Sequence, residues 1–198
     1  MKIKCVILDW GGVCDPKSAI DILLDYISKK YKIPLKNAKE IWDAHNMDYL
    51  LGKEEGKIFW KRYFKELGIP MTYRDVKKFF REGGADQRIL NIAKALKEKY
   101  TTILLSDNFK ERTDFIKKRY NLKEIFDICI FSNEVGLKKP QREIFELVLK
   151  KAKCLPQECI YFDDLQKNVE EANKLGIVAI KFISYEKLKE ELELRRVL

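Results

Sequence analysis

The sequence lacks any apolar run long enough to cross a membrane, and its amino terminus lacks the apolar core of a signal peptide. The apolar run before Asp9 spans only four residues, and no internal repeat or low-complexity segment occurs. The five cysteines show no Cys-x-x-Cys spacing, and several fall in predicted strands, where cysteine behaves as a small apolar residue. We therefore expect a cytoplasmic protein with reduced cysteines and no membrane partner.

Histidine is nearly absent, and the positive charge is not gathered in one place. His45 is the only histidine, and a lone histidine in a helical segment is more often a surface or capping residue than a catalytic one. Lysine and arginine outnumber the acidic residues by 40 to 31, for a net charge of +9. Lysines alternate with glutamates, as at residues 94–99 and 186–196, without a compact basic patch that contains aromatic residues. This pattern predicts a solvated surface and no nucleic-acid partner.

Short apolar runs alternate with helical patterns over most of the chain. The runs predict five strands, at residues 3–8, 102–105, 128–131, 159–162 and 177–181. Apolar spacing typical of helices occurs after the later runs, at residues 111–120, 141–152, 168–175 and 185 to about 196. Such alternation predicts an α/β fold, in which a parallel sheet carries helices on both faces.

The segment between the first two predicted strands has a different pattern. Apolar residues recur there at helical spacing in four places, separated by prolines and glycines: residues 20–27, 38–42, 58–64 and 76–80. We expect a small all-α cap domain at residues 15–87, inserted into a core domain made of residues 1–14 and 88–198. Asp15-Pro16 and Gly83-Gly84 are the expected hinges of this cap.

Polar side chains follow four of the predicted strands at the points where they end: Asp9, then Ser106-Asp107-Asn108, then Ser132-Asn133, then Asp163-Asp164. Each could serve only as a turn or helix cap, because serine, aspartate and asparagine favour such positions. The adjacent pair Asp163-Asp164 is harder to explain in that way, since neighbouring carboxylates repel and need a cation, a proton or solvent. Ligands of open α/β sheets bind at this edge, so we expect a site there.

These residue types are suited to phosphoryl transfer. An aspartate such as Asp9 can attack phosphorus and carry the phosphoryl group as an aspartyl-phosphate. Mg²⁺ prefers one or two carboxylates together with phosphate oxygen and water, and Asp9 and Asp164 could supply the carboxylates. Lys139 would balance the remaining charge, and Ser106 would hydrogen-bond a phosphate oxygen.

The ordered set of motifs resembles the haloacid dehalogenase superfamily of aspartate-nucleophile hydrolases with a helical cap (subclass I). The chain matches the four motifs of that family in order: Asp9, Ser106, Lys139 before Pro140, and Asp163-Asp164 with Asn168. The resemblance implies a Rossmann-like core and Mg²⁺ as the cofactor. It also implies a hydrolase that removes phosphate from a small phosphorylated metabolite.

The resemblance also implies a role for each residue of the motifs. The catalytic residues would be Asp9 as nucleophile, Lys139 and Ser106. The phosphate or substrate would contact Ser106, Asp107, Asn108, Lys139, Trp10 and Gly11. The metal would be held by Asp9, the backbone carbonyl of Gly11, Asp164 as the direct ligand, and Asp163 as a second acidic partner. The side chain of Trp10 faces either the entrance under the cap or the flank of the sheet.

Gly11 departs from the pattern of the family phosphatases. They usually have a second aspartate at this position, which protonates the leaving oxygen and then activates water. Loss of a general acid or base costs about 10²–10⁴-fold in rate. Three hypotheses follow. The first is a Mg²⁺-dependent phosphatase that acts on a good leaving group or uses Asp15, His45 or a water in place of that aspartate. The second is a binding or regulatory protein without turnover, and the third is a 2-haloacid dehalogenase.

The predicted cap would select the leaving group, because the core residues touch only the phosphoryl group. One polar cluster precedes Leu50 and is formed by Asp43, His45, Asn46, Asp48 and Tyr49. Aromatic residues at helical spacing, including Trp42, Phe59 and Trp60, are more often core than pocket residues.

Overall fold

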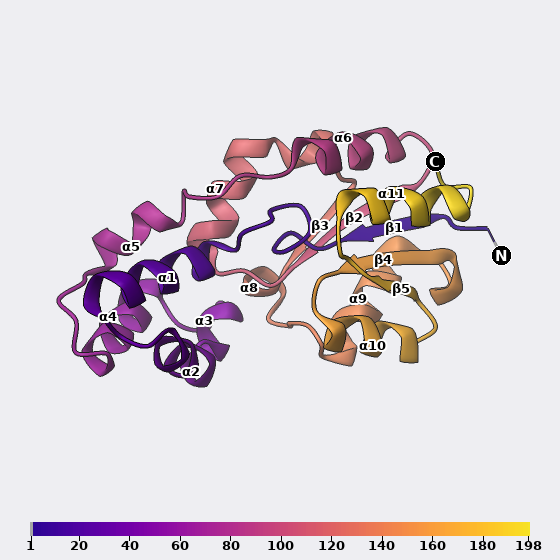
Figure 1. Ribbon diagram of the computed structural model, residues 1–198. Helices are drawn as coiled ribbons and strands as arrows, with labels where there is room; N and C mark the ends of the chain where they lie inside the picture. Colours follow the sequence, from indigo (N-terminus) through magenta and orange to yellow (C-terminus); the bar gives the residue numbers. More distant parts are fainter. Residues whose placement is uncertain (1) are drawn as a thin grey trace.

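The computed structural model describes residues 2–198 and contains a five-stranded parallel sheet with the order β3-β2-β1-β4-β5 (Figure 1). The strands are β1 (Cys5–Leu8), β2 (Thr101–Ser106), β3 (Ile128–Phe131), β4 (Cys159–Asp163) and β5 (Val178–Lys181). All five lie where the sequence predicts strands. Because β1 is the central strand, Asp9, which follows it, lies at the middle of the carboxyl edge of the sheet.

Helices cover both faces of the sheet, which confirms the predicted α/β architecture. Alternate residues of β1 point to opposite faces, so Val6 and Leu8 join one core cluster and Cys5 and Ile7 join another. The first cluster lies under α6 (Gln87–Leu96), α7 (Lys110–Tyr120) and α11 (Tyr185–Leu194), and the second under α9 (Arg142–Ala152) and α10 (Gln166–Lys174). Burial of each large apolar side chain stabilises the fold by about 1.5–3 kcal/mol.

A separate helical layer lies at one end of the sheet (Figure 1). Its elements are α1 (Ala19–Tyr31), α2 (Leu35–His45), α3 (Met47–Leu50), α4 (Gly56–Glu66) and α5 (Tyr73–Phe79). Aromatic residues fill its own core: Trp42 stacks on Trp60 with 5.5 Å between ring centroids, and Tyr49 stacks on Phe59 at 4.6 Å. The aromatic residues at helical spacing are therefore mainly core residues, as the sequence favours.

The sequence analysis does not predict several short elements and one longer helix. The short helix α3 follows α2 after one residue, and α8 (Ser132–Val135) follows β3 directly. The longer one, α6, begins after the N-cap Asp86, so the predicted domain boundary between residues 87 and 88 falls in its first turn. The two remaining elements are single turns of 3-10 helix at Leu122–Glu124 and Pro156–Glu158. None of the helices within residues 2–198 has the length and apolar character needed to cross a bilayer.

The chain crosses between the sheet and the helical layer twice, and the two crossings lie side by side. The backbone N–H of Asp86 donates to the carbonyl of Cys14 at 2.7 Å. Gly83 has a φ of 81°, and a Cβ atom there would lie 3.1 Å from Oδ2 of Asp15. The two segments predicted as hinges are therefore in contact with each other.

One buried guanidinium holds both crossings. Arg112 lies on α7, and its side chain is only 2% exposed. It donates to the carbonyls of Phe80 at 2.5 Å and Glu82 at 2.9 Å, and to Oδ2 of Asp15 at 2.6 Å. Burial raises the pKa of Asp15 and lowers the pKa of Arg112, so each charge depends on the other for its stability.

Candidate functional site

Asp9 begins a tight loop at the carboxyl end of β1. Its backbone N–H donates to the carbonyl of Phe162 on β4 at 3.0 Å, and its carboxylate Oδ1 accepts from the N–H of Trp10 at 2.6 Å. Two backbone hydrogen bonds close the loop. The N–H of Gly12 donates to the carbonyl of Asp15 at 2.8 Å, and the N–H of Asp15 donates to the carbonyl of Trp10 at 2.7 Å. The Asp9 side chain is 8% exposed, so the fold presents one nearly buried carboxylate at a fixed position.

Lys139 bridges two carboxylates at this edge. Its Nζ lies 2.8 Å from Oδ1 of Asp9 and 2.7 Å from Oδ2 of Asp163, and the side chain is 2% exposed. Burial alone would lower the pKa of Lys139, but the charges of Asp9 and Asp163 outweigh it and hold that pKa above its ordinary value. Lys139 therefore stays charged and anchors the centre of the site.

Asp163 and Asp164 lie in different environments although they are adjacent. Asp163 is fully buried and accepts hydrogen bonds from Lys139, the Tyr161 hydroxyl, the amide of Asn168 and the N–H of Leu165. Burial would raise its pKa, but Lys139 and these donors hold the pKa below its usual range. The carboxyl of Asp164 is half-buried, and burial together with the charge of Asp163 raises its pKa.

The site fits a divalent cation. One carboxylate oxygen from each of Asp9, Asp163 and Asp164 lies within 4.8 Å of the others, and among residues 2–198 only Lys139 forms an ion pair with them. Burial raises the pKa of Asp9, the charge of Asp163 adds to this, and Lys139 opposes it. A hard cation such as Mg²⁺ prefers carboxylate oxygens and would stabilise the ionised form of these groups. The structure thus brings the sequence-predicted acidic residues together with Lys139.

The residues after β2 lie at the same edge of the sheet. Ser106 is buried, and its Oγ accepts from the side-chain amide of Asn108 at 3.2 Å, which leaves the hydroxyl proton free to donate. Asp107 accepts from the backbone N–H of Lys139 at 3.1 Å. The N-cap of α7 is Phe109 rather than Asn108. Asn108 is therefore not the N-cap of α7. Its contact with the phosphate or the leaving group stays a prediction.

The side chain of Trp10 lies against the flank of the sheet. Its side chain is 1% exposed, lies in the core cluster under α6 and α7, and contacts the Tyr120 ring at 5.1 Å between centroids. It therefore takes the orientation toward the flank of the sheet, which leaves little surface for a substrate. The backbone N–H of Trp10 donates to Asp9, and Trp10 is also among the residues that line the cavity described below, so its predicted contact with the substrate stays a prediction.

The two side chains considered as replacements for the missing acid are engaged elsewhere. Asp15 is 1% exposed and is paired with Arg112. His45, at the end of α2, lies 3.0 Å from Oε2 of Glu66 at the end of α4, and it does not line the cavity beside Gly11.

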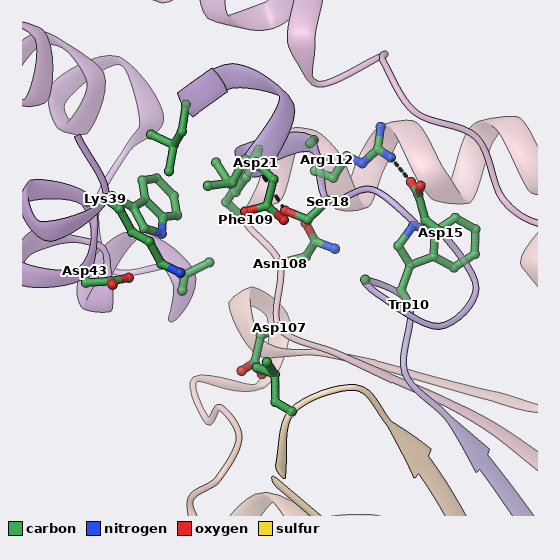
Figure 2. A pocket seen from close by; sticks show the side chains of 17 residues that line it. Trp10, Asp15, Ser18, Asp21, Lys39, Asp43, Asp107, Asn108, Phe109 and Arg112 are labelled. Carbon is green, nitrogen blue, oxygen red and sulfur yellow. Dashed lines mark hydrogen bonds and ion pairs between the residues drawn. The ribbon is translucent and has the colours of Figure 1, made fainter. Parts of the chain in front are cut away.

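A cavity of about 250 Å³ lies between this edge of the sheet and the helical layer (Figure 2). The core contributes Gly11, Asp107 and Asn108 to its wall. The helical layer contributes four polar side chains: Ser18, Asp21, Lys39 and Asp43. Of the polar cluster predicted before Leu50, only Asp43 lines this cavity.

The sequence prediction missed Ser18, Asp21 and Lys39 as cavity residues. The one local signal lies at the start of α1, where Ser18 is the N-cap and its Oγ accepts from the N–H of Asp21 at 3.3 Å. A serine three residues before an acidic residue is a common helix start, which fixes both side chains relative to the helix axis. It does not reveal which surface the helix end faces.

A family model described as haloacid dehalogenase-like hydrolase matches residues 3–176. The chain belongs to this family. The assignment agrees with the resemblance found from the four sequence motifs and with the parallel sheet described above.

Relatives of this haloacid dehalogenase-like hydrolase include phosphatases. It is 27% identical to D-ribitol-5-phosphate phosphatase of Bacteroides thetaiotaomicron over 190 residues, which cover 88% of this chain and 89% of that protein. It is 33% identical to bifunctional epoxide hydrolase 2 of Rattus norvegicus over 97 residues, but the match covers only 46% of this chain and 18% of the rat protein. A match to the phosphorylated carbohydrates phosphatase of Thermotoga maritima, 35% identical over 63 residues, covers 32% of this chain and 29% of that protein.

Solved structures share the fold of this hydrolase. A Bacteroides thetaiotaomicron enzyme of the haloacid dehalogenase family, in complex with magnesium and inorganic phosphate, superposes with a TM-score of 0.75 at 22% identity, covering 94% of this chain and 98% of that one. L-2-haloacid dehalogenase of Xanthobacter autotrophicus with covalently bound chloropropionic acid gives a TM-score of 0.66 at 16% identity, covering 99% and 84%.

Gly11 and Gly12 of this hydrolase differ in the space around them, so we expect alanine at the two positions to affect Mg²⁺ binding differently. Gly12 has a φ of 76°, and a Cβ atom there would lie 2.3 Å from Cγ of Asp164. We expect Gly12→Ala to displace Asp164 and weaken Mg²⁺ binding by roughly 10–100-fold, the range found when support of a metal ligand is lost. Gly11→Ala is the matched control, because its Cβ would meet only Cβ of Ser18 at 4.0 Å. Titration calorimetry with Mg²⁺ measures both, and equal affinities for the two variants would contradict the expectation.

Proposed function

We propose that the protein is a Mg²⁺-dependent phosphatase that acts on a small phosphorylated metabolite through an aspartyl-phosphate on Asp9. The observation that carries the proposal is the cluster at the sheet edge. There Lys139 Nζ lies 2.8 Å from Asp9 and 2.7 Å from Asp163, and three carboxylates converge within 4.8 Å. A nucleophilic carboxylate next to a cation site and a fixed ammonium is suited to an anionic phosphate.

Each residue has a distinct part in the proposed reaction. Asp9 attacks phosphorus while the bond to the leaving oxygen breaks. Lys139 balances charge on Asp9 and on the phosphoryl oxygens, and the Ser106 hydroxyl donates to one of those oxygens. Asp163 positions Lys139, as its set of donors indicates. Asp9, Asp164, the carbonyl of Gly11 and Asp163 would hold Mg²⁺, which when bound offsets the repulsion between carboxylate and phosphate.

The cavity supports a small, hydroxylated leaving group. Its volume of about 250 Å³ is small for a ligand pocket. Ser18, Asp21, Lys39 and Asp43 can donate to or accept from hydroxyl groups, and two of the relatives are named for phosphorylated polyols or carbohydrates. We therefore place polyol and sugar phosphates first among the substrates to test.

Removal of the metal tests this function. Wild-type protein is expected to release phosphate from at least one member of a panel of polyol, sugar and aryl phosphates in the presence of Mg²⁺. EDTA should abolish the release and added Mg²⁺ should restore it, because the clustered carboxylates would otherwise repel the phosphate. A malachite green assay measures the product. The absence of release from every ester at saturating Mg²⁺ would reject the proposed activity.

A binding protein without turnover is the second candidate, and Gly11 is the observation that favours it. Such a protein would bind Mg²⁺ and a phosphate mimic such as BeF₃⁻ and gain thermal stability, while the ester panel remained intact. A 2-haloacid dehalogenase is less well supported, because the clustered carboxylates fit a metal-dependent phosphate site. Chloride release from 2-chloropropionate without added metal would be the sign of that activity.

A further inference from the structure

We propose that Asp21, on the first turn of α1, is the general acid and base of the reaction. It would transfer the proton that Gly11, which has no side chain, cannot transfer. The proposal rests on the phosphatase function proposed above and adds a catalytic residue to it. It is derived from the contacts around Gly11, the free carboxylate of Asp21 and the engagement of the other acidic groups nearby.

The first turn of α1 stands over the space that a side chain at position 11 would enter. A Cβ atom built on Gly11 would meet a single atom within 4 Å, Cβ of Ser18 at 4.0 Å. Ser18 is the N-cap of α1, and its Oγ accepts from the N–H of Asp21 at 3.3 Å. Figure 2 shows Asp21 beside Ser18 in the cavity. Asp21 thus belongs to the same helix turn as Ser18, the side chain nearest to position 11, and it lines the same cavity.

The carboxylate of Asp21 has no cationic partner in the described part of the chain. Within residues 2–198, no lysine, arginine or histidine forms an ion pair with it. The charge of Asp21 also acts on Asp164. Burial and the charge of Asp163 raise the pKa of Asp164, and the charge of Asp21 contributes in the same direction. Asp21 therefore lines the cavity from the side of the helical layer, and the leaving group would enter this cavity.

The other acidic side chains of the cavity are less suited to this role. Asp15 is paired with Arg112. Asp107 accepts from the backbone N–H of Lys139 and follows β2, which places it on the side of the transferred phosphoryl group. In Figure 2, Asp43 lies near Lys39 and away from Ser18, the side chain nearest to Gly11.

The proposed proton transfers balance in two steps. In the first, an Asp9 oxygen bonds to phosphorus, the bond from phosphorus to the ester oxygen breaks, and the departing oxygen takes the proton of the Asp21 carboxylic acid. In the second, the oxygen of a water molecule bonds to phosphorus while the Asp21 carboxylate takes a proton from that water. The bond to Asp9 breaks, which returns Asp9 as a carboxylate and Asp21 as an acid. The sum is ester and water to alcohol and inorganic phosphate.

Leaving groups of different basicity distinguish this role from a structural one. An alkoxide needs a proton to depart, whereas p-nitrophenolate departs without one. Asp21→Asn is therefore expected to lower kcat/KM by about 10²–10⁴-fold for the best alkyl phosphate of the panel, and by less than about tenfold for p-nitrophenyl phosphate. Asp25→Asn is the matched control: Asp25 is exposed one turn further along α1 and does not line this cavity, and we expect no change with either ester.

A second variant tests the placement over Gly11. Gly11→Asp added to Asp21→Asn should restore hydrolysis of the alkyl phosphate, because its Cβ would make only an ordinary van der Waals contact with Cβ of Ser18, at 4.0 Å. A double variant as slow as Asp21→Asn would overturn the placement, and equal losses with both esters, or no loss with either, would overturn the proton-transfer role. If the wild type releases no phosphate at all, the proposed function fails instead. If release depends on Asp9 but not on Asp21, only the present inference fails.

Discussion

Replacement of Asp9 with asparagine is expected to lower phosphate release by on the order of 10⁴-fold or more, the scale on which removal of a covalent nucleophile acts in other hydrolases. An amide nitrogen or oxygen in place of the carboxylate cannot form a stable acyl-phosphate. The substitution preserves shape, so the N–H of Trp10 and the ammonium of Lys139 retain a neighbouring oxygen. The loss should therefore be chemical rather than structural.

Two measurements separate these possibilities for Asp9→Asn. Mass spectrometry after an acid quench should find one added phosphoryl group on wild-type protein during turnover and none on the variant. Thermal unfolding should show that the variant is folded, with Asp25→Asn as the matched exposed aspartate. A folded Asp9→Asn protein that releases phosphate at the wild-type rate would exclude Asp9 as the nucleophile.

Arg112→Met is expected to lower the free energy of unfolding by roughly 3–5 kcal/mol, the cost of removing one partner of a buried ion pair. The substitution leaves Asp15, whose side chain is 1% exposed, without a compensating charge. It also leaves the carbonyls of Phe80 and Glu82 without their donor. Methionine keeps an apolar side chain of similar length, so loss of volume contributes little.

Urea denaturation of the wild type and four variants measures this effect. Arg142→Met is the control, because its pair with Glu146 joins side chains that are 66% and 52% exposed, and such pairs contribute at most about 1 kcal/mol. Asp15→Asn should also destabilise, and the double variant should lose less than the sum of the single losses, by about 1 kcal/mol or more. If Arg112→Met lowers the free energy of unfolding no more than Arg142→Met does, the buried pair does not stabilise the fold as inferred.

The sheet could be predicted from the sequence because its signals are local. The runs that become β1 and β4 are apolar throughout and end in carboxylates, so both the strands and the polar edge are visible in a few consecutive residues. The parallel order then brings Asp9 and Asp163 together without further information. The expectation that Asp164 is the direct metal ligand stays a prediction. The half-buried position of its carboxyl, beside a fully satisfied Asp163, is consistent with it.

What the sequence could not predict depends on contacts between distant segments. Asp15 and Arg112 are 97 positions apart, and nothing near either residue indicates the other. Asp15 consequently resembled a free acid. The Trp10 orientation depends on Tyr120 in α7, and the cavity side of α1 depends on how the helical layer rests against the sheet edge. Helix periodicity defines an apolar face but not which polar residues meet a distant strand end.

The Arg112 contacts bear on how this protein can be recombined with its relatives. Two of the three acceptors of the guanidinium are backbone carbonyls, which any sequence supplies, and the third is the carboxylate of Asp15. A chimera that exchanges the helical layer between relatives therefore keeps these contacts if Asp15, residues 80–82 and Arg112 all stay with the recipient, provided that the length of each crossing is kept. The junctions belong on the helical side of Asp15 and of Phe80, so that the recipient retains the whole cluster. The residues of the sheet edge would then stay with the recipient, and the donor would supply the residues at the positions of Ser18, Asp21, Lys39 and Asp43 of the cavity.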